Sequence, residues 1–242
     1  MGASARADAD AVCALAAKLK LRGVLLPLPA LAAEPGDLTE TACERLRQTA
    51  AARGVAIVGL AGALPGAVAQ QLAGGETTRA AARARLQAVI RLCSELGARL
   101  ACCELTARDM LRGKLRPEQA ETLVAETLRA CAPLAESRRV TLCMSGGGDL
   151  AVERVVQKAN HPNIRLACEG AMLERLATPL IQTRLVRARP GDDPARLGGQ
   201  LAALGYDQWV ALRLDGEDEP AAGKWLKKFG DACAATSSST GA

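Results

Sequence analysis

The 242-residue sequence is poor in aromatic side chains and has a single histidine. One Tyr, one Phe and two Trp make up its aromatic residues, and all of them lie in the last fifth of the chain: Tyr206, Trp209, Trp225 and Phe229. Proteins that bind single-stranded nucleic acid usually stack the bases on aromatic rings, and most of this chain offers none. We therefore expect no nucleic-acid partner.

Long apolar runs are also missing. No run reaches the ~18 residues that a membrane-spanning helix requires, so we expect no membrane partner. The first eight residues contain no continuous apolar stretch of the kind found in secretory signals, and we expect a cytoplasmic protein. Its nine cysteines include no C-x-x-C pair, which argues against a zinc or redox motif. Most of them lie in apolar segments, as reduced core cysteines do, and we predict neither a cofactor nor a metal.

The charge balance is uninformative about partners. The net charge is +5, but 24 of the 31 basic residues are Arg and seven are Lys in a chain rich in Ala, which is typical of a coding bias. Hydrophobic residues make up 49% and charged residues 24%, the proportions of a globular protein with a large core.

Short apolar runs alternate with longer segments of helical periodicity. The helices are amphipathic, with apolar residues at i, i+3, i+4 and i+7, as at Leu86, Val89, Ile90 and Cys93. The runs predict seven strands: 23–27, 55–60, 100–105, 140–144, 164–168, 185–189 and 209–214. Strands separated by helices pair in parallel, which is compatible with an α/β barrel or a doubly wound sheet. No G-x-G-x-x-G motif follows the first strand, which weakens the second alternative.

Strand parity favours the barrel. Between 140 and 145, Val140, Leu142 and Met144 share one face, and Thr141, Cys143 and Ser145 share the other. The strands 164–168 and 209–214 repeat this pattern. Glu169 and Arg213 belong to their smaller, more polar faces. An aliphatic face suits covering helices, and the other face suits a barrel interior that opens onto a pocket. We predict an α/β fold: one TIM-type (β/α) barrel domain over 1–233, followed by a disordered tail at 234–242.

Several segments of the chain resemble segments of a known protein family. They are the helix 86–98, Val140-Thr141-Leu142, the segment 161–166 and the segment 204–210, in that order and spacing. Together they are similar to the xylose isomerase-like TIM barrels, in particular the sugar phosphate isomerase/epimerase family. The family's first strand has no counterpart, because a helix is expected over 7–20. The resemblance therefore implies a barrel that lacks its first strand or begins at a truncated end.

The resemblance also implies a divalent metal held by a Glu, an Asp, His residues and a second Glu at the carboxyl ends of the late strands. The matching positions here are occupied by Ser145, Glu169, Met172, Arg187 and Arg213. Only Glu169 could bind a metal, and two permanent cations would lie beside it. The only histidine, His161, precedes a strand and belongs at the opposite end of the barrel. We expect metal-dependent catalysis to be lost.

Two interpretations of the replaced residues stay open. Arg187, Arg189 and Arg213 could bind an anion together with the turn Ser145-Gly146-Gly147, whose backbone N–H groups favour anions. Alternatively, Glu169 and the arginines form an internal salt-bridge cluster, with Asp149 as a helix cap. Glu104, at the end of its strand, is either an additional partner or a surface carboxylate.

We therefore expect a binding or assembly protein for an anionic small molecule, phosphorylated or a carboxylate. The alternative is a metal-independent isomerase or lyase with Glu169 as the base, acting on an anionic sugar or keto acid. A decayed coding frame is a third interpretation. With its first strand missing, the barrel should have unpaired edges at 23 and 209, so we also expect a homodimer, a gap covered by the helix 7–20, or low stability.

Overall fold

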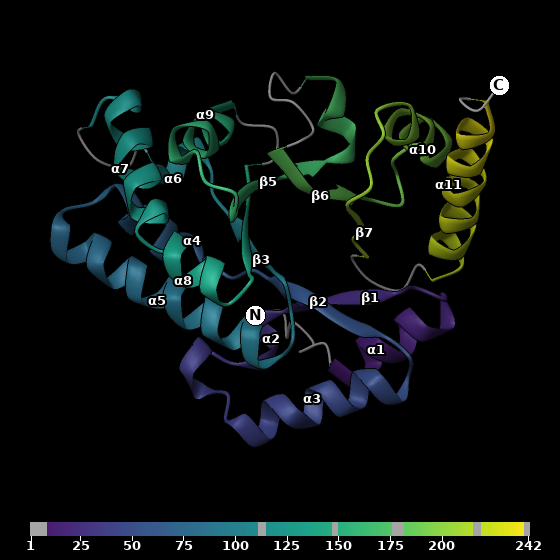
Figure 1. Ribbon diagram of the computed structural model, residues 1–242, viewed down its shortest axis with the longest axis horizontal. Coiled ribbons are helices and arrows are strands. Elements are labelled where there is room, and N and C mark those ends of the chain that lie inside the picture. The colour runs from purple at the N-terminus through teal and green to yellow at the C-terminus, as the bar shows by residue number, and fades with distance from the viewer. Residues whose placement is uncertain (1–8, 111–114, 147–149, 176–181, 215–218, 240–242) are drawn as a thin grey trace, which may run out of the picture. The chain divides into compact units, whose positions relative to one another are not determined.

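A computed structural model describes residues 9–110, 115–146, 150–175, 182–214 and 219–239. The chain divides into two compact units, Met1–Leu166 and Ala167–Ala242. Figure 1 shows the alternation of strands and helices along the chain. That the chain forms a single domain stays a prediction.

Unit 1 contains five parallel strands, of which the last continues into unit 2. They are β1 (Gly23–Pro27), β2 (Ala56–Ala61), β3 (Leu100–Glu104), β4 (Thr141–Ser145) and β5 (Ile164–Glu169). Each pairs with its neighbour in chain order, with Cys102 opposite Cys143 and Glu104 opposite Ser145. The register therefore places Glu104 and Ser145 side by side at the carboxyl ends of their strands.

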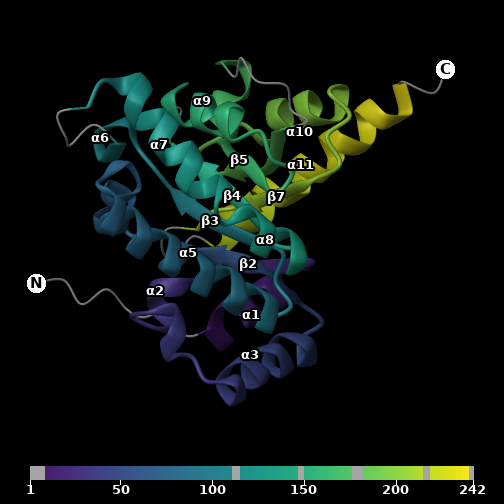
Figure 2. The same cartoon turned by 60° about the vertical axis from the view of Figure 1, so that its left-hand side comes forward.

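One helix of unit 1 precedes β1, and the others connect the strands. These helices are α1 (Ala9–Lys18), α2 (Leu28–Leu31), η1 (Pro35–Asp37), α3 (Glu40–Ala52), α4 (Gly66–Ala69), η2 (Gln70–Ala73), α5 (Glu76–Glu95), α6 (Ala107–Met110), α7 (Pro117–Arg129), α8 (Ala132–Ser137) and α9 (Leu150–Ala159). Figures 1 and 2 both show α1 and α3 side by side, and the Arg53 guanidinium donates to the Asp10 carboxylate at 2.7 Å. The expected opening helix is confirmed, and within 9–22 no strand precedes β1.

The core of unit 1 confirms the strand parity. Leu142 and Met144 are fully buried and belong to the apolar core that the helices complete, together with Ile164 and Leu166. Cys143, on the opposite face of β4, is also fully buried. Two faces of one strand can be buried at once only when the sheet is covered on both sides.

Unit 2 contains η3 (Gly170–Arg175), β6 (Thr183–Ala188), α10 (Pro194–Ala203), β7 (Trp209–Leu212) and α11 (Glu219–Ser239). Strands β6 and β7 are parallel, with Arg187 opposite Ala211. Their outward face packs Val186 and Ala188 against Leu197, Leu201 and Trp225. All seven expected strands are thus present, each within two residues of its predicted bounds.

Helices α10 and α11 lie side by side in Figures 1 and 2. Their contact passes through Gly198 in α10, where an added Cβ would lie 2.9 Å from the Phe229 carbonyl oxygen. Asp193 caps the start of α10 by accepting from the N–H groups of Ala195 and Arg196. Gly205, with φ of +64°, ends it in the left-handed conformation that a side chain disfavours. The chain can then turn directly into β7.

The end of unit 2 is helical as far as the structure describes it. The serines of the segment 234–242 predict disorder, and α11 extends to Ser239. Adding residues to an existing helix costs much less than starting one, and the anchored turns at Trp225 and Phe229 precede this segment. No helix in the described parts of the chain combines the length and apolar character needed to cross a bilayer.

Candidate anion site at the strand ends

Glu169 and Arg187 form a short ion pair at the carboxyl ends of β5 and β6 in unit 2. The Arg187 Nη2 lies 2.5 Å from Glu169 Oε1, and each side chain is only 13% exposed. Arg189, just beyond β6, brings its Nε to 3.7 Å from Glu169 Oε2 while remaining 56% exposed. Both oxygens of the carboxylate therefore face guanidinium groups, as expected for an Arg cluster around Glu169.

The loop that carries Arg189 is anchored from two sides. The Arg189 N–H donates to the Asp192 carboxylate at 2.8 Å, and the Asp192 N–H donates back to the Arg189 carbonyl at 3.0 Å. The Trp225 indole N–H, in α11, donates to the Asp192 carbonyl at 2.8 Å. Sequence reasoning missed Asp192, although Pro190-Gly191-Asp192 is a recognisable turn signal.

Arg213 follows β7 at the same edge as Arg187. Its backbone N–H donates to the Ala188 carbonyl at 2.8 Å, which holds its backbone beside the end of β6, and its side chain is exposed. With Arg187 and Arg189, it brings three permanent cations to the strand ends that carry Glu169. These four side chains alone give this edge a net positive charge.

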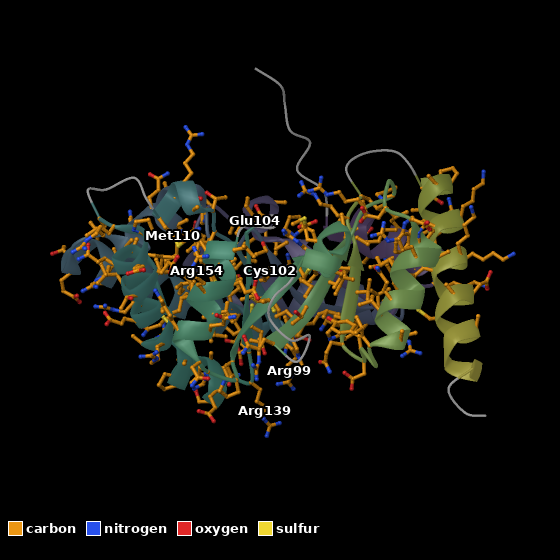
Figure 3. The ribbon with its side chains drawn as sticks, turned by 90° about the horizontal axis from the view of Figure 1, so that it is seen from above. Arg99, Cys102, Glu104, Met110, Arg139 and Arg154 are labelled. Atoms are coloured by element: carbon orange, nitrogen blue, oxygen red, sulfur yellow. The ribbon has the colours of Figure 1, made fainter. Side chains whose placement is uncertain are left out.

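Ser145 ends β4 in unit 1, next to Glu104 in β3. Its side chain is 2% exposed, and its hydroxyl has no hydrogen-bond partner in the described structure. An unsatisfied buried hydroxyl carries a desolvation cost that a ligand could relieve. Glu104 is exposed, and Figure 3 shows it at the other end of β3 from Arg99.

The glycine turn after β4 is described only at its first residue. A Cβ on Gly146 would lie 2.5 Å from Val152 Cγ2, so the close approach of α9 is a sufficient reason for glycine at that position. Gly147 and Asp149 lie outside the described residues. The expected convergence of Ser145, Gly146 and Gly147 with the arginines stays a prediction.

The residues at the positions that the resemblance assigns to metal ligands do not fit a divalent metal. Within the described ranges, no three His, Cys, Asp or Glu side chains are arranged to hold an ion. The guanidinium groups of Arg187 and Arg213 are hydrogen-bond donors without a lone pair to offer a metal. Glu169 already faces Arg187, and Met172, in η3, offers only a thioether.

His161 lies at the amino end of β5, away from this edge. Its Nδ1 accepts from the Asn163 N–H at 3.1 Å, and its carbonyl accepts from the Ile164 N–H at 3.0 Å. These contacts shape the turn into β5. The expected position of His161 at the end opposite the site is confirmed.

Comparisons with known proteins agree with the architecture. The family model for the xylose isomerase-like TIM barrel matches residues 13–167, which is more than half of the chain. No curated protein matches the chain significantly at the level of sequence.

Several solved structures share the fold at low sequence identity. D-psicose 3-epimerase from Clostridium cellulolyticum H10, solved with D-tagatose, has a TM-score of 0.74 at 14% identity and covers 94% of each chain. The 3-keto-D-glucoside 4-epimerase from E. coli has a TM-score of 0.72 at 13% identity, covering 96% of this chain and 97% of its own. A xylose isomerase domain protein from Planctomyces limnophilus has a TM-score of 0.70 at 13% identity, covering 93% and 92%.

These structural likenesses establish the fold, and the predicted TIM-barrel type of α/β architecture is confirmed. The match to the family model extends from α1 into β5 and ends at residue 167, two residues before Glu169. The chain belongs to the xylose isomerase-like TIM barrel family.

Proposed function

We propose that this protein is a divergent member of the sugar isomerase and epimerase group that has lost metal-dependent catalysis and binds an anionic small molecule. The observation that carries the proposal is the Arg187–Glu169 ion pair, with Arg189 beside it, at positions where the resemblance implies metal ligands. A permanent cation there repels a divalent metal and attracts a phosphate or carboxylate.

The exposed arginines are the groups available to a ligand. Arg187 is largely buried on Glu169, whereas Arg189 is more than half exposed and only loosely engaged at 3.7 Å. Arg189 can rotate toward an incoming anion without leaving Glu169 unneutralised. Each charged hydrogen bond contributes about 1.5–3 kcal/mol. Two such bonds correspond to micromolar to millimolar affinity after the association entropy is subtracted.

The comparisons support a sugar-like ligand. The similar structures include epimerases of ketoses and of a keto-glucoside, so the fold accommodates substrates of that size. The chain has no aromatic residue before Tyr206, and aromatic faces are the usual platform for a neutral sugar ring. A phosphorylated sugar or a sugar acid is the ligand class that the arginines favour.

The proposal is tested by titration calorimetry with ribose 5-phosphate, inorganic phosphate and ribose. We expect saturable heat from the two phosphates and none from ribose. Arg189→Ala should weaken phosphate binding about tenfold, the equivalent of ~1.4 kcal/mol. Arg184→Ala, which removes an exposed arginine from the other end of β6, is the matched control and should have no effect. Equal responses to ribose and ribose 5-phosphate, or unchanged binding in Arg189→Ala, would contradict the proposal.

The second interpretation assigns Glu169 as the base of a metal-independent isomerase or lyase. Both oxygens of the Glu169 carboxylate face guanidiniums, so a substrate proton could reach them only after substrate binding draws Arg189 or Arg187 away. Turnover of an anionic sugar or keto acid that survives EDTA and disappears in Glu169→Gln would favour the enzyme. Binding without turnover favours the binding protein.

Self-association is a further part of this proposal. Strand β7 is exposed or half-exposed along its whole length, and Trp209 is 38% exposed. A strand of this kind is prone to pair with another chain. Sedimentation equilibrium should detect a dimer, and Val210→Pro, which removes a backbone donor from β7, should shift it toward monomer. A monomer at all concentrations would contradict the assembly role.

A further inference from the structure

A cavity of about 380 Å³ lies in unit 2 at the amino end of β7, the end opposite to the Glu169 site. Three segments form its walls: the end of α10, the loop before β7 and the middle of α11. The residues of its lining that bear on a ligand are Tyr206, Asp207, Gln208, Phe229 and Cys233. This volume lies within the range of small-molecule sites, so the cavity can hold a compact organic ligand.

Two of the four aromatic residues in the whole sequence line this cavity. The Tyr206 hydroxyl donates to the Trp209 carbonyl at 3.1 Å, which fixes its ring. Phe229 stacks on Trp225 with ring centroids 5.1 Å apart and planes 12° apart. Rings held in this way present preformed faces to an apolar body, at little entropic cost on binding.

Several hydrogen-bond donors of the lining are already used within the protein, so the lining offers a ligand mainly acceptors. The Gln208 amide is used at both ends, since it donates to Asp207 and accepts from Arg184. The Tyr206 and Gly205 N–H groups donate to the Leu201 and Ala202 carbonyls. Asp207 is exposed and lines the cavity, so its charge can face a ligand.

The aromatic faces and the Asp207 carboxylate complement a ligand that donates hydrogen bonds and carries a positive charge. We propose that the cavity binds a small organic cation, a primary ammonium on a compact flat apolar body, with the ammonium on Asp207 and the body against Tyr206 and Phe229. The site is separate from the anion site, because the two lie at opposite ends of the strands and require ligands of opposite charge.

Phenethylammonium is the probe, and 2-phenylethanol and 3-phenylpropionate are its neutral and anionic counterparts. Calorimetry on the full chain should give saturable binding of the amine, at least tenfold weaker binding of the alcohol and none of the acid. Asp207→Asn should weaken amine binding at least tenfold. Asp231→Asn, on an exposed position of α11, is the matched control and should leave it unchanged. Equal affinity for amine and alcohol, or no effect of Asp207→Asn, would overturn the proposal.

Cys233 provides a second readout that is independent of heat. It is the one cysteine of the nine that is not buried, and it lines the cavity. N-ethylmaleimide should modify it in the native chain, and saturating phenethylammonium should slow that modification at least fivefold. Cys233→Ser should abolish the modification and retain amine binding. A labelling rate that is unchanged by the amine would place the amine outside this cavity and overturn the proposal.

Discussion

The Glu121 carboxylate of α7 is held between two cations of α9, Arg154 and Lys158. Its oxygens lie 2.7 Å from Arg154 Nη2 and 2.8 Å from Lys158 Nζ, and the Glu121 side chain is 3% exposed. The two cations are themselves partly exposed, so they remain hydrated while they neutralise the buried acid. The contact joins two helices that follow successive strands.

Glu121→Gln should reduce the free energy of unfolding by about 1–3 kcal/mol, because a buried charged acceptor is replaced by a neutral one. Urea denaturation followed by circular dichroism measures this change. Glu126→Gln, in the same helix but 56% exposed, is the control and should stay within about 0.5 kcal/mol of the unmodified protein. Equal losses of unfolding free energy in both variants would show that the α7–α9 contact does not account for the destabilisation.

The contacts of Glu121 with Arg154 and Lys158 also predict that stability depends on pH. Burial raises the pKa of Glu121, but hydrogen bonds from Arg154 and Lys158 outweigh it and lower the pKa below the usual 4.5. The contribution to stability is therefore complete above pH 4.5 and is lost as the pH falls through the lowered pKa. The difference in unfolding free energy between the unmodified protein and Glu121→Gln should shrink over that range. A difference that stays constant down to pH 3 would contradict this pairing.

Gly198 is predicted to tolerate no side chain. An added Cβ would lie 2.9 Å from the Phe229 carbonyl oxygen, so Gly198→Ala must push α10 away from α11, at about 1–3 kcal/mol. Gly230→Ala is the matched comparison, because a Cβ there meets nothing within 4 Å in the same helix pair. That change should stabilise the protein by about 0.5–1 kcal/mol through helix propensity. Thermal unfolding of both variants should therefore shift in opposite directions.

The thiols should differ sharply in reactivity. Eight of the nine cysteines are buried, and burial raises the pKa of Cys131 to about 11 and that of Cys103 well above its usual range. Because the thiolate is the reactive form, an excess of N-ethylmaleimide should modify only Cys233 in the native protein and all nine cysteines in guanidinium chloride. Peptide mass spectrometry identifies the sites. Rapid native labelling of Cys103 or Cys131 would contradict the packing of unit 1.

Purified protein should contain no stoichiometric transition metal at the strand ends. The expectation rests on Arg187, whose guanidinium already occupies one oxygen of Glu169, and on Arg213 at the same edge. Elemental analysis for Mn, Co and Zn is the measurement, with Glu169→Ala as the control. About one ion per chain, lost in that variant, would show that Glu169 binds a metal in spite of its arginines.

The fold and part of the site were predictable because they depend on local patterns. Parallel strands end at one edge, so Glu169, at the end of its strand, and Arg187, in the next strand along the chain, could be placed together without coordinates. The parity at Leu142 and Met144 likewise followed from the two-residue period of a strand. In both cases the chain positions alone determine which side chains are neighbours.

Other features depend on how helices pack, which spacing does not determine. The support of Arg189 by Asp192 requires the indole of Trp225, which is more than thirty residues away in the chain. The cavity is lined by residues of α10, of α11 and of the loop before β7, and the close contact of the two helices at Gly198 could not be read from spacing. The composition of the last residues indicated disorder, whereas α11 continues through most of them.

The uneven distribution of aromatic residues makes the two units spectroscopically distinct. Both tryptophans, Trp209 and Trp225, and the single tyrosine lie in unit 2, so unit 1 has no intrinsic fluorescence. An emission change on unfolding thus reports on unit 2, while far-ultraviolet circular dichroism is dominated by the many helices of unit 1. Coincident transitions in the two signals mean that both units unfold as one cooperative block, and separate transitions give the stability of each unit without any introduced probe.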